Sequence, residues 1–166
     1  MVTFDNADAQ KLGPISAVER LLDYATAAQC MMMAAVCDAA LTLTAQYAKD
    51  RVQFERAIAT FQAVGQRAAD AYIDTEAVRL TALHAAWRLS VGKPATEQVA
   101  TAKFWAAEAG QRVMHAAQHI HGGVGVDRDY PLHRYFLAAK QLELNLGGAT
   151  QSLVRLGKIL ADTAVS

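Results

Sequence analysis

Residues 16–47 read SAVERLLDYATAAQCMMMAAVCDAALTLTAQY and predict one long helix. The opening SAVE has the pattern of a capping box, in which the Ser16 hydroxyl accepts from the Glu19 backbone N–H and the Glu19 carboxylate reaches back. Apolar residues then recur at spacings of three and four, with Gln29 as the one polar break. The members of this stripe are Val18, Leu22, Ala25, Met32, Val36, Ala40, Leu43 and Tyr47. We expect a helix about 50 Å long that turns this stripe toward a partner.

The same periodicity predicts further helices along the rest of the chain. A second helix is expected over residues 60–89, with Val78, Ala82 and Ala85 on its apolar face, and glycine and proline at 92–94 stop it. A third is expected over residues 96–120, with Val99, Val113 and Ile120 on its apolar face. Two shorter helices are expected over residues 131–142 and 149–161. These elements predict an all-α fold, an antiparallel up-and-down four-helix bundle with a short extra helix and an N-terminal arm.

The composition is typical of a soluble globular protein with one domain, because 53% of the residues are hydrophobic and 19% are charged. Lys plus Arg and Asp plus Glu balance at 16 each, so neither nucleic acid nor a membrane surface is an expected partner. The most apolar run, residues 30–45, is interrupted by Asp38 and is too short to span a bilayer. Without a signal-like N-terminal segment, we expect a cytoplasmic protein. Cys30 and Cys37 lie about 10.5 Å apart along one helix, which predicts reduced core thiols.

Cationic, amide and aromatic side chains gather where the first helix gives way to the second. Arg51, Gln53 and Phe54 follow the end of the first helix, and Phe61 and Gln62 open the second. Arginine can fork onto a pyrophosphate, and phenylalanine can present its face to a base. The alternative is a solvated turn with two core phenylalanines. The residues alone leave both interpretations open.

The third helix runs into the glycine-rich segment QHIHGGVGVDRDYP, residues 118–131. A dinucleotide fingerprint needs a strand before its glycines, whereas here a helix precedes them. Gly122 can end the helix in a left-handed conformation, and bare backbone also lets another molecule approach. His115 and His119 share one helix face and His121 follows, which suggests a metal site. No carboxylate lies at a helpful offset, so a hydrogen-bonded structural or cofactor-facing histidine is favoured.

Several longer motifs follow one another along the chain. They read YAKDRVQFERAIATFQAVGQRAAD at residues 47–70, AAWRL at 85–89, ATAKFWAAEAGQRV at 100–113 and HIHGGVGVDRDYPLHRYF at 119–136. In this order they resemble the C-terminal helical domain of the acyl-CoA dehydrogenase family, including its Tyr-Ala-x-x-Arg-x-Gln-Phe-Gly turn and its Gln-Ile-His-Gly-Gly-x-Gly stretch. The resemblance also implies that residues 1–15 are the remnant of a β-domain exit strand and a linker, before a helical domain at residues 16–166.

The resemblance implies a flavin enzyme that assembles as dimers or tetramers, with FAD lying across a subunit interface. It places Arg51 at the FAD pyrophosphate and Phe54 beside the adenosine half. His119 takes the place of the family's usual Gln. The positions that it assigns to the cofactor are Arg51, Gln53, Phe54, Phe61, Gln62, His119, Gly122 and Gly123.

The reaction implied by the resemblance is α,β-desaturation of an acyl-CoA thioester, a step of lipid metabolism and fatty acid β-oxidation. A carboxylate removes the α-proton while hydride leaves the β-carbon for the flavin. Family branches place this base at either of two positions. The Glu of a Tyr-Glu-Gly-Thr motif becomes Leu146 here, and the position on the first helix becomes Ala25. Neither side chain can take a proton.

Three explanations for the missing base follow. The favoured one is a non-catalytic subunit or fragment of a hetero-oligomeric acyl-CoA dehydrogenase, in which a related subunit supplies the Glu. The second is a homomeric enzyme with a displaced carboxylate, Asp23 or Glu143. The third is a helical interaction module without flavin, against which the retention of Arg51 and Gln62 speaks. The family's other domains have no counterpart among these motifs, so we expect a partner and exposed apolar surface that promotes self-association.

Overall fold

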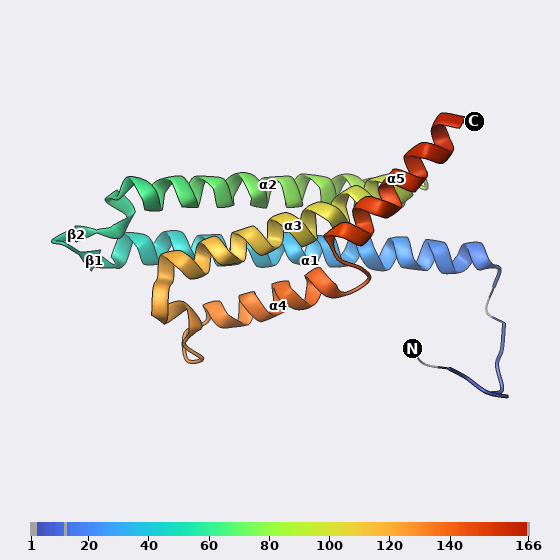
Figure 1. The fold of residues 1–166 in the computed structure, drawn as a ribbon, viewed down its shortest axis with the longest axis horizontal. Coiled ribbons are helices and arrows are strands. Elements are labelled where there is room, and N and C mark those ends of the chain that lie inside the picture. The colour runs from blue at the N-terminus through green and yellow to red at the C-terminus, as the bar shows by residue number, and fades with distance from the viewer. Residues whose placement is uncertain (1–2, 12, 166) are drawn as a thin grey trace.

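The structure is a computed structural model that describes residues 3–11 and 13–165 (Figure 1). The described helices are α1 (Ile15–Asp50), α2 (Gln62–Ser90), α3 (Thr96–His121), α4 (Leu132–Leu144) and α5 (Ala149–Val165). An antiparallel hairpin of β1 (Val52–Gln53) and β2 (Arg56–Ala57) and the 3-10 helix η1 (Ile58–Thr60) join α1 to α2. A second 3-10 helix, η2 (Gly122–Val126), follows α3. The predicted all-α fold is confirmed. The small hairpin was not predicted because two-residue strands are too short to show an alternating pattern.

The helices are arranged as the predicted up-and-down bundle. Each of α1, α2 and α3 runs antiparallel to its neighbour in the chain, and α4 lies against α1 and α3 (Figure 1). Helix α5 packs on α3 and then extends beyond the bundle, where it is drawn in red. The C-terminal ends of α1 and α3 and the N-terminal end of α2 therefore lie at the same end of the molecule.

The N-terminal arm precedes α1 without regular structure in residues 3–11 and 13–14. Helix α1 begins at Ile15 with Pro14 as its N-cap, and no side chain caps it. The predicted capping box at Ser16 and Glu19 is therefore wrong, because the helix starts at Ile15 and Ser16 lies inside it. The assignment of residues 1–15 to a β-domain remnant stays a prediction, and Met1 and Val2 lie outside the described residues.

The core is built from small side chains where α1, α2 and α3 meet. The predicted faces of α2 and α3 are confirmed, with Val78 and Ala82 of α2 and Val99 and Val113 of α3 at zero exposure. Small buried residues let helix axes approach closely. Gly110 of α3 is an example, because a side chain there would collide with Met33 of α1.

The predicted stripe of α1 is wrong by one residue along most of the helix. Val18, Leu22 and Met32 belong to that stripe but are 49%, 43% and 58% exposed. The buried face consists of Asp23, Thr26, Ala27, Cys30, Met33, Ala34, Cys37, Ala40, Thr44 and Ala48. Apolar residues occur all around α1, so periodicity alone did not separate its faces. The small residues occupy the close seam, and most of the bulkier Leu and Val side chains lie outside it.

Helix α1 also explains the most apolar part of the chain. It is the one helix in the described ranges long and apolar enough to cross a membrane by length and composition, and its buried face lines the bundle core. Cys30 and Cys37 are buried in that face as free thiols, as predicted. Burial raises the pKa of each thiol to about 12, so both stay protonated.

Candidate functional site

At the corner between α1 and α2, the backbone of Arg51 is hydrogen-bonded on both sides while its side chain has no partner among the described residues. The backbone N–H of Arg51 donates to the Tyr47 carbonyl at 2.8 Å, and the Arg51 carbonyl accepts from the Ile58 N–H at 2.9 Å. The Arg51 guanidinium is exposed and makes no hydrogen bond or ion pair with any residue that the structure describes. Its position is set by the backbone, while its charge is available to an external anion.

The tip of the hairpin presents an aromatic ring to solvent. Phe54 and Glu55 form a two-residue loop with φ angles of 52° and 64°. Positive φ at both central positions is typical of a type I′ turn, whose twist matches a β-hairpin. Phe54 is 87% exposed, and its ring meets the Phe61 ring edge-on at 6.1 Å between centroids. Phe54 is therefore not a core residue, contrary to the solvated-turn alternative with two core phenylalanines.

The start of α2 adds polar groups to the same corner. Phe61 is the N-cap of α2, and the Arg56 guanidinium carbon lies 4.2 Å from the centre of its ring. Gln62, the first residue of α2, is exposed. The first N–H groups of a helix lack intrahelical partners and carry partial positive charge. The side-chain amide of Gln53 is also exposed, and donates to the Val52 carbonyl at 2.7 Å.

The glycine turn after α3 is open on its outer side. Gly122 has a φ of 61°, which a glycine adopts without strain, and ends α3 as predicted. A side chain at Gly122 or Gly123 would meet no atom within 4 Å, whereas one at Gly125 would collide with Gln118. Packing within the described chain thus restricts side chains at position 125 but not at 123. His119 beside this turn is exposed.

Aromatic rings join the glycine turn to the end of α1. The Tyr47 and His121 rings stack with centroids 4.3 Å apart, and the Tyr130 ring lies 5.2 Å from His121. His121 Nδ1 lies 2.9 Å from the Ala117 carbonyl, and Nε2 lies 3.1 Å from the Tyr130 hydroxyl. We assign the neutral tautomer in which Nδ1–H donates to Ala117 and Nε2 accepts from Tyr130. Burial lowers the pKa of His121, which favours this neutral form.

The histidines do not form a metal site in the described ranges. No group of three or more His, Cys, Asp or Glu side chains among those residues could hold an ion. His115 instead meets the Phe136 ring edge-on at 5.5 Å, and His121 is buried between tyrosines. His121 is therefore the hydrogen-bonded structural histidine that the sequence favoured. The sequence did not indicate its stacking partner, because Tyr47 lies on α1, far from His121 along the chain.

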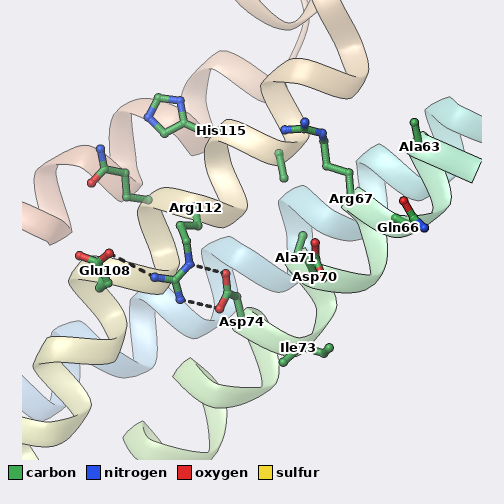
Figure 2. Close-up of a pocket in the computed structure, with 12 residues that line it drawn as sticks. Ala63, Gln66, Arg67, Asp70, Ala71, Ile73, Asp74, Glu108, Arg112 and His115 are labelled. Atoms are coloured by element: carbon green, nitrogen blue, oxygen red, sulfur yellow. Dashed lines mark hydrogen bonds and ion pairs between the residues drawn. The ribbon is translucent and has the colours of Figure 1, made fainter.

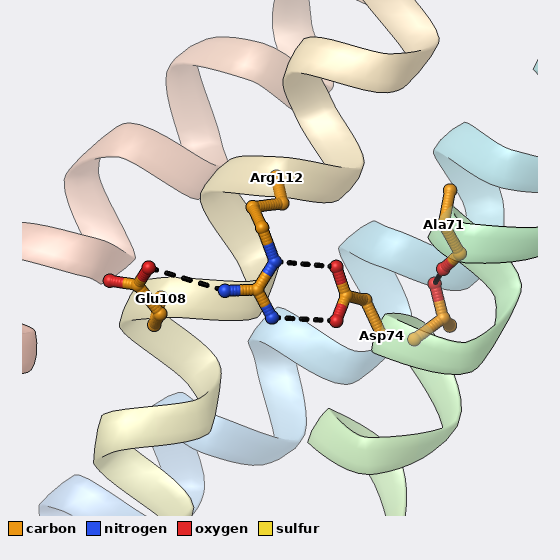
Figure 3. A network of polar contacts seen from close by, with 5 residues as sticks. Ala71, Asp74, Glu108 and Arg112 are labelled. Carbon is orange, nitrogen blue, oxygen red and sulfur yellow. Dashed lines mark hydrogen bonds and ion pairs between the residues drawn. The ribbon is translucent and has the colours of Figure 1, made fainter. Parts of the chain in front are cut away.

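A broad groove of about 920 Å³ separates the outer faces of α2 and α3 (Figure 2). Its central charges pair with one another (Figure 3). Arg112 Nε and Nη2 donate to the two Asp74 oxygens at 2.8 Å and 2.6 Å, and Nη1 donates to Glu108 at 3.2 Å. Because these charges pair with each other, we interpret them as a structural tie between α2 and α3 and not as a ligand site. Sequence reasoning did not predict this tie, whose α2 and α3 members are 38 residues apart.

One small cavity marks the positions that the resemblance assigns to the catalytic base. It has a volume of about 120 Å³, and Leu146 and Thr26, the neighbour of Ala25, both line it. Leu146 has a φ of 57° and is 47% exposed. Lys103 and Arg155 also line this cavity. Leu146, one of the two base positions, therefore lines this cavity, and Ala25, the other, adjoins the lining residue Thr26 along α1. Neither side chain carries a proton acceptor.

The two nominated substitutes for the base already have partners. Asp23 is buried, and its two oxygens accept from Thr96 Oγ1 and from Arg155 Nη2, each at 2.8 Å. The Glu143 carboxylate accepts from Lys140 Nζ at 2.5 Å. Because these hydrogen bonds already engage both carboxylates, neither geometry favours proton removal from a substrate.

Lys103 is a buried cation whose structural role was not predicted from the sequence. Its ammonium donates to the Leu142 carbonyl at 2.5 Å and to the Glu143 carbonyl at 3.3 Å, near the C-terminal end of α4. Burial lowers the pKa of Lys103. The side chain thereby satisfies helix-end carbonyls that would otherwise lack donors.

Comparison with known proteins supplies the family of this bundle. A family profile described as "Acyl-CoA dehydrogenase, C-terminal domain" matches residues 15–157. The chain belongs to the acyl-CoA dehydrogenase family. Among relatives in this family, it is 50% identical to acyl-CoA dehydrogenase FadE27 of Mycobacterium tuberculosis, over 93% of this chain and 44% of that protein.

Solved structures of acyl-CoA dehydrogenase relatives share the bundle. The ChsE4–ChsE5 complex from Mycobacterium tuberculosis matches 90% of this chain and 40% of its own, with a TM-score of 0.85 and 54% identity. The steroid ACAD Tcur3481–Tcur3483 matches 93% of this chain and 42% of its own, with a TM-score of 0.89 and 44% identity. The structure of PigA with FAD and proline covers 84% of this chain and 37% of its own chain, with a TM-score of 0.79 and 25% identity. The chain spans less than half the length of each of these proteins.

Membership in the acyl-CoA dehydrogenase family bears on two parts of this chain, the Arg51 corner and the glycine turn. The family is flavin-dependent, and one structural neighbour contains FAD. The Arg51 corner and the turn of Gly122 and Gly123 are the parts of this chain that carry the family's motifs, and the bundle brings both to one end (Figure 1).

Proposed function

We propose that this chain belongs to a flavin-dependent acyl-CoA dehydrogenase assembly as the subunit or fragment without the catalytic base. In this proposal, the chain holds the nucleotide half of FAD and supplies an oligomerisation surface. The observation that carries the proposal is the combination of an open cofactor end with a cavity where Leu146 replaces a carboxylate.

The residues at the open end fit the nucleotide half of FAD. The unpartnered Arg51 guanidinium can fork onto the pyrophosphate, and the N-terminus of α2 favours the same negative charge. The exposed ring of Phe54 offers a face to the adenosine half, with Phe61 beside it. Gln53, Gln62 and His119 offer exposed side chains that donate or accept hydrogen bonds. Gly122 and Gly123 leave room for close approach.

The chemistry of the proposed assembly needs a carboxylate from elsewhere. FAD supplies the hydride acceptor for α,β-desaturation of an acyl-CoA thioester. The α-proton needs a base within hydrogen-bond reach, and loss of such a base removes about 10² to 10⁴ of rate. Because Leu146 and Ala25 cannot act, a related subunit of the assembly provides the Glu in this proposal. The name of the ChsE4–ChsE5 complex supports a hetero-oligomer.

The relatives also suggest a substrate class and a location. The steroid ACAD Tcur3481–Tcur3483 supports an acyl-CoA with a bulky polycyclic group, within lipid metabolism that resembles fatty acid β-oxidation. Exposed apolar residues on α1 and α5, including Leu21, Leu153, Val154 and Leu160, provide surface for partner subunits. We propose a cytoplasmic assembly without nucleic acid or membrane as a partner.

A homomeric enzyme with a displaced carboxylate is the second candidate. It would use Asp23 or Glu143, and its support is that the partners of both residues, Arg155 for Asp23 and Lys103 for the Glu143 carbonyl, line the cavity beside Leu146. The interaction module without flavin is the third candidate, and it predicts that Arg51 has no ligand.

Co-expression of the chain with Glu-bearing dehydrogenase-family chains tests these alternatives. We expect the purified assembly to carry flavin, visible in its absorbance spectrum, and to reduce a dye in the presence of an acyl-CoA, while the chain alone is inactive. Glu→Gln at the base of the partner subunit should abolish the activity and keep the flavin. Activity of the chain alone, lost on replacing Asp23 or Glu143, would establish the homomeric enzyme. Absence of flavin from every assembly would leave the interaction module.

A further inference from the structure

We infer that His121 is a positioning residue, which holds the glycine turn of Gly122 and Gly123 in fixed register with the Arg51 corner through its contacts with Tyr47 and Tyr130. The inference rests on the proposed function, because it assumes that both parts contact one FAD molecule. His121 itself would not touch the cofactor. Its effect passes through the backbone that it anchors.

A continuous path of contacts links the two parts of the site. Tyr47 precedes Arg51 by one helical turn and accepts its backbone N–H at 2.8 Å. The Tyr47 ring stacks on His121 with centroids 4.3 Å apart and planes at 24°. His121 is bonded directly to Gly122. The stack therefore joins the end of α1, which presents the cation, to the end of α3, which presents the bare backbone.

The imidazole is fixed on both of its nitrogens. Nδ1 bonds to the Ala117 carbonyl at 2.9 Å within α3, and Nε2 bonds to the Tyr130 hydroxyl at 3.1 Å beyond η2. The Tyr130 ring also lies edge-on to Tyr47, with centroids 6.2 Å apart. His121 and Tyr130 thus bracket η2 from its two sides, and both rest on α1.

The glycine turn needs such an anchor because Gly122 and Gly123 have no side chains that could hold it to a neighbouring element. No atom lies within 4 Å of the place that a side chain would take at Gly122 or Gly123. The turn itself is held by the bond from Gln118 Nε2 to the Gly122 carbonyl at 3.2 Å. Glycine backbone has many accessible conformations, and ordering it on cofactor binding costs conformational entropy. An anchor at the adjacent residue orders the turn beforehand.

Four variants of the co-expressed assembly test the positioning role. His121→Phe keeps an aromatic ring on Tyr47 and removes both hydrogen bonds, and Tyr47→Leu removes the stack. Tyr47→Phe retains the ring and serves as the conservative rescue. Val99→Ala is the matched control, because Val99 is fully buried near the start of α3, at the far end of that helix from His121. The measurement is the rate of FAD release, followed by flavin fluorescence at a temperature where thermal melts show every variant folded.

We expect His121→Phe and Tyr47→Leu to release FAD about tenfold faster than the unmodified assembly, which corresponds to the loss of one or two ordinary contacts. Tyr47→Phe should stay within about twofold. Val99→Ala should lower the melting temperature and leave FAD release unchanged. Equal release rates in His121→Phe, Tyr47→Leu and the unmodified assembly would overturn the inference and leave the proposed function standing. Faster release in Val99→Ala as well would overturn it in favour of a general stability effect. An unmodified assembly without flavin would overturn the proposed function, and this inference with it.

Discussion

The phenol ring of Tyr47 lies against the imidazole of His121, with centroids 4.3 Å apart, although one residue ends α1 and the other ends α3. This contact sets the relation between the Arg51 corner and the glycine turn. The same end of the bundle carries an unpaired guanidinium, an exposed aromatic ring and open glycine backbone. Substitutions of the buried contact and of the exposed groups can therefore test stability and binding separately.

Arg51→Ala should weaken the retention of FAD in the co-expressed assembly by about ten- to hundredfold, because charge-assisted hydrogen bonds to a phosphate are lost. Arg51→Lys should recover part of the affinity, since it keeps the charge but not the fork. Flavin content after dialysis measures the effect. Arg20→Ala, which removes an exposed arginine near the start of α1, is the control and should keep its flavin. Full flavin content in Arg51→Ala would count against the proposed nucleotide site.

The stability of the folded chain should fall as the pH drops below about 6.5, the pKa of an unfolded histidine. Burial lowers the pKa of His121, with the hydrogen bond to Ala117 acting in the opposite sense. The unfolded chain then binds the proton more readily, so stability is complete above the unfolded pKa of about 6.5 and is lost as pH falls toward the folded pKa. Urea unfolding at several pH values measures this slope. His121→Phe should reduce the slope, whereas His84→Gln, at an exposed histidine, should not. An unchanged slope in His121→Phe would assign the titration to other groups.

Asp23→Asn should lower the free energy of unfolding by about 1 to 3 kcal/mol, since Arg155 and Thr96 lose a charged acceptor. The lower part of this range is expected because the Arg155 side chain is 40% exposed and its charge is screened. Activity per folded assembly should not show the drop of about 10² to 10⁴ that follows loss of a base. Glu143→Gln should behave in the same way in the activity assay. A large loss of turnover in either variant, with normal folding, would favour the homomeric enzyme.

Lys103→Met should destabilise the fold by about 1 to 3 kcal/mol, because the Leu142 and Glu143 carbonyls would lose their buried donor. Chemical denaturation gives the change in free energy. Lys158→Met on the exposed side of α5 is the matched control, and should stay within about 0.5 kcal/mol. Equal stabilities for the two variants would show that water replaces the ammonium without loss.

Glu55→Gly should stabilise the hairpin, since the Glu55 φ of 64° suits glycine better than a residue with a side chain. The relief of strain exceeds the entropy that glycine adds to the unfolded chain, so a net gain of about 0.5 to 1 kcal/mol is expected. Ala57→Gly is the control, because Ala57 has a φ of −60° and should only lose stability there. Thermal unfolding of both variants shows whether their effects have opposite signs.

The sequence by itself determined where the helices lie and which faces of α2 and α3 are buried. The stripe of Val78, Ala82 and Ala85 recurs at spacings of three and four, and Gly92 and Pro94 interrupt the pattern locally. These signals depend on neighbours within a few turns, so they can be read without tertiary contacts. The motifs around Arg51 and Gly122 likewise marked the family and the candidate cofactor residues.

Only the tertiary structure decided which face of α1 is buried and which polar groups are already paired. Apolar residues surround α1, so the choice between the stripes of Met32 and Met33 depended on which side chains fit the close seam with α2 and α3. Asp23 meets Arg155 across 132 residues, which removes it from the plausible bases. His121 owes its role to Tyr47 and Tyr130 in the same way. Packing volume and long-range pairing are properties of the assembled bundle, and local periodicity contains no record of them.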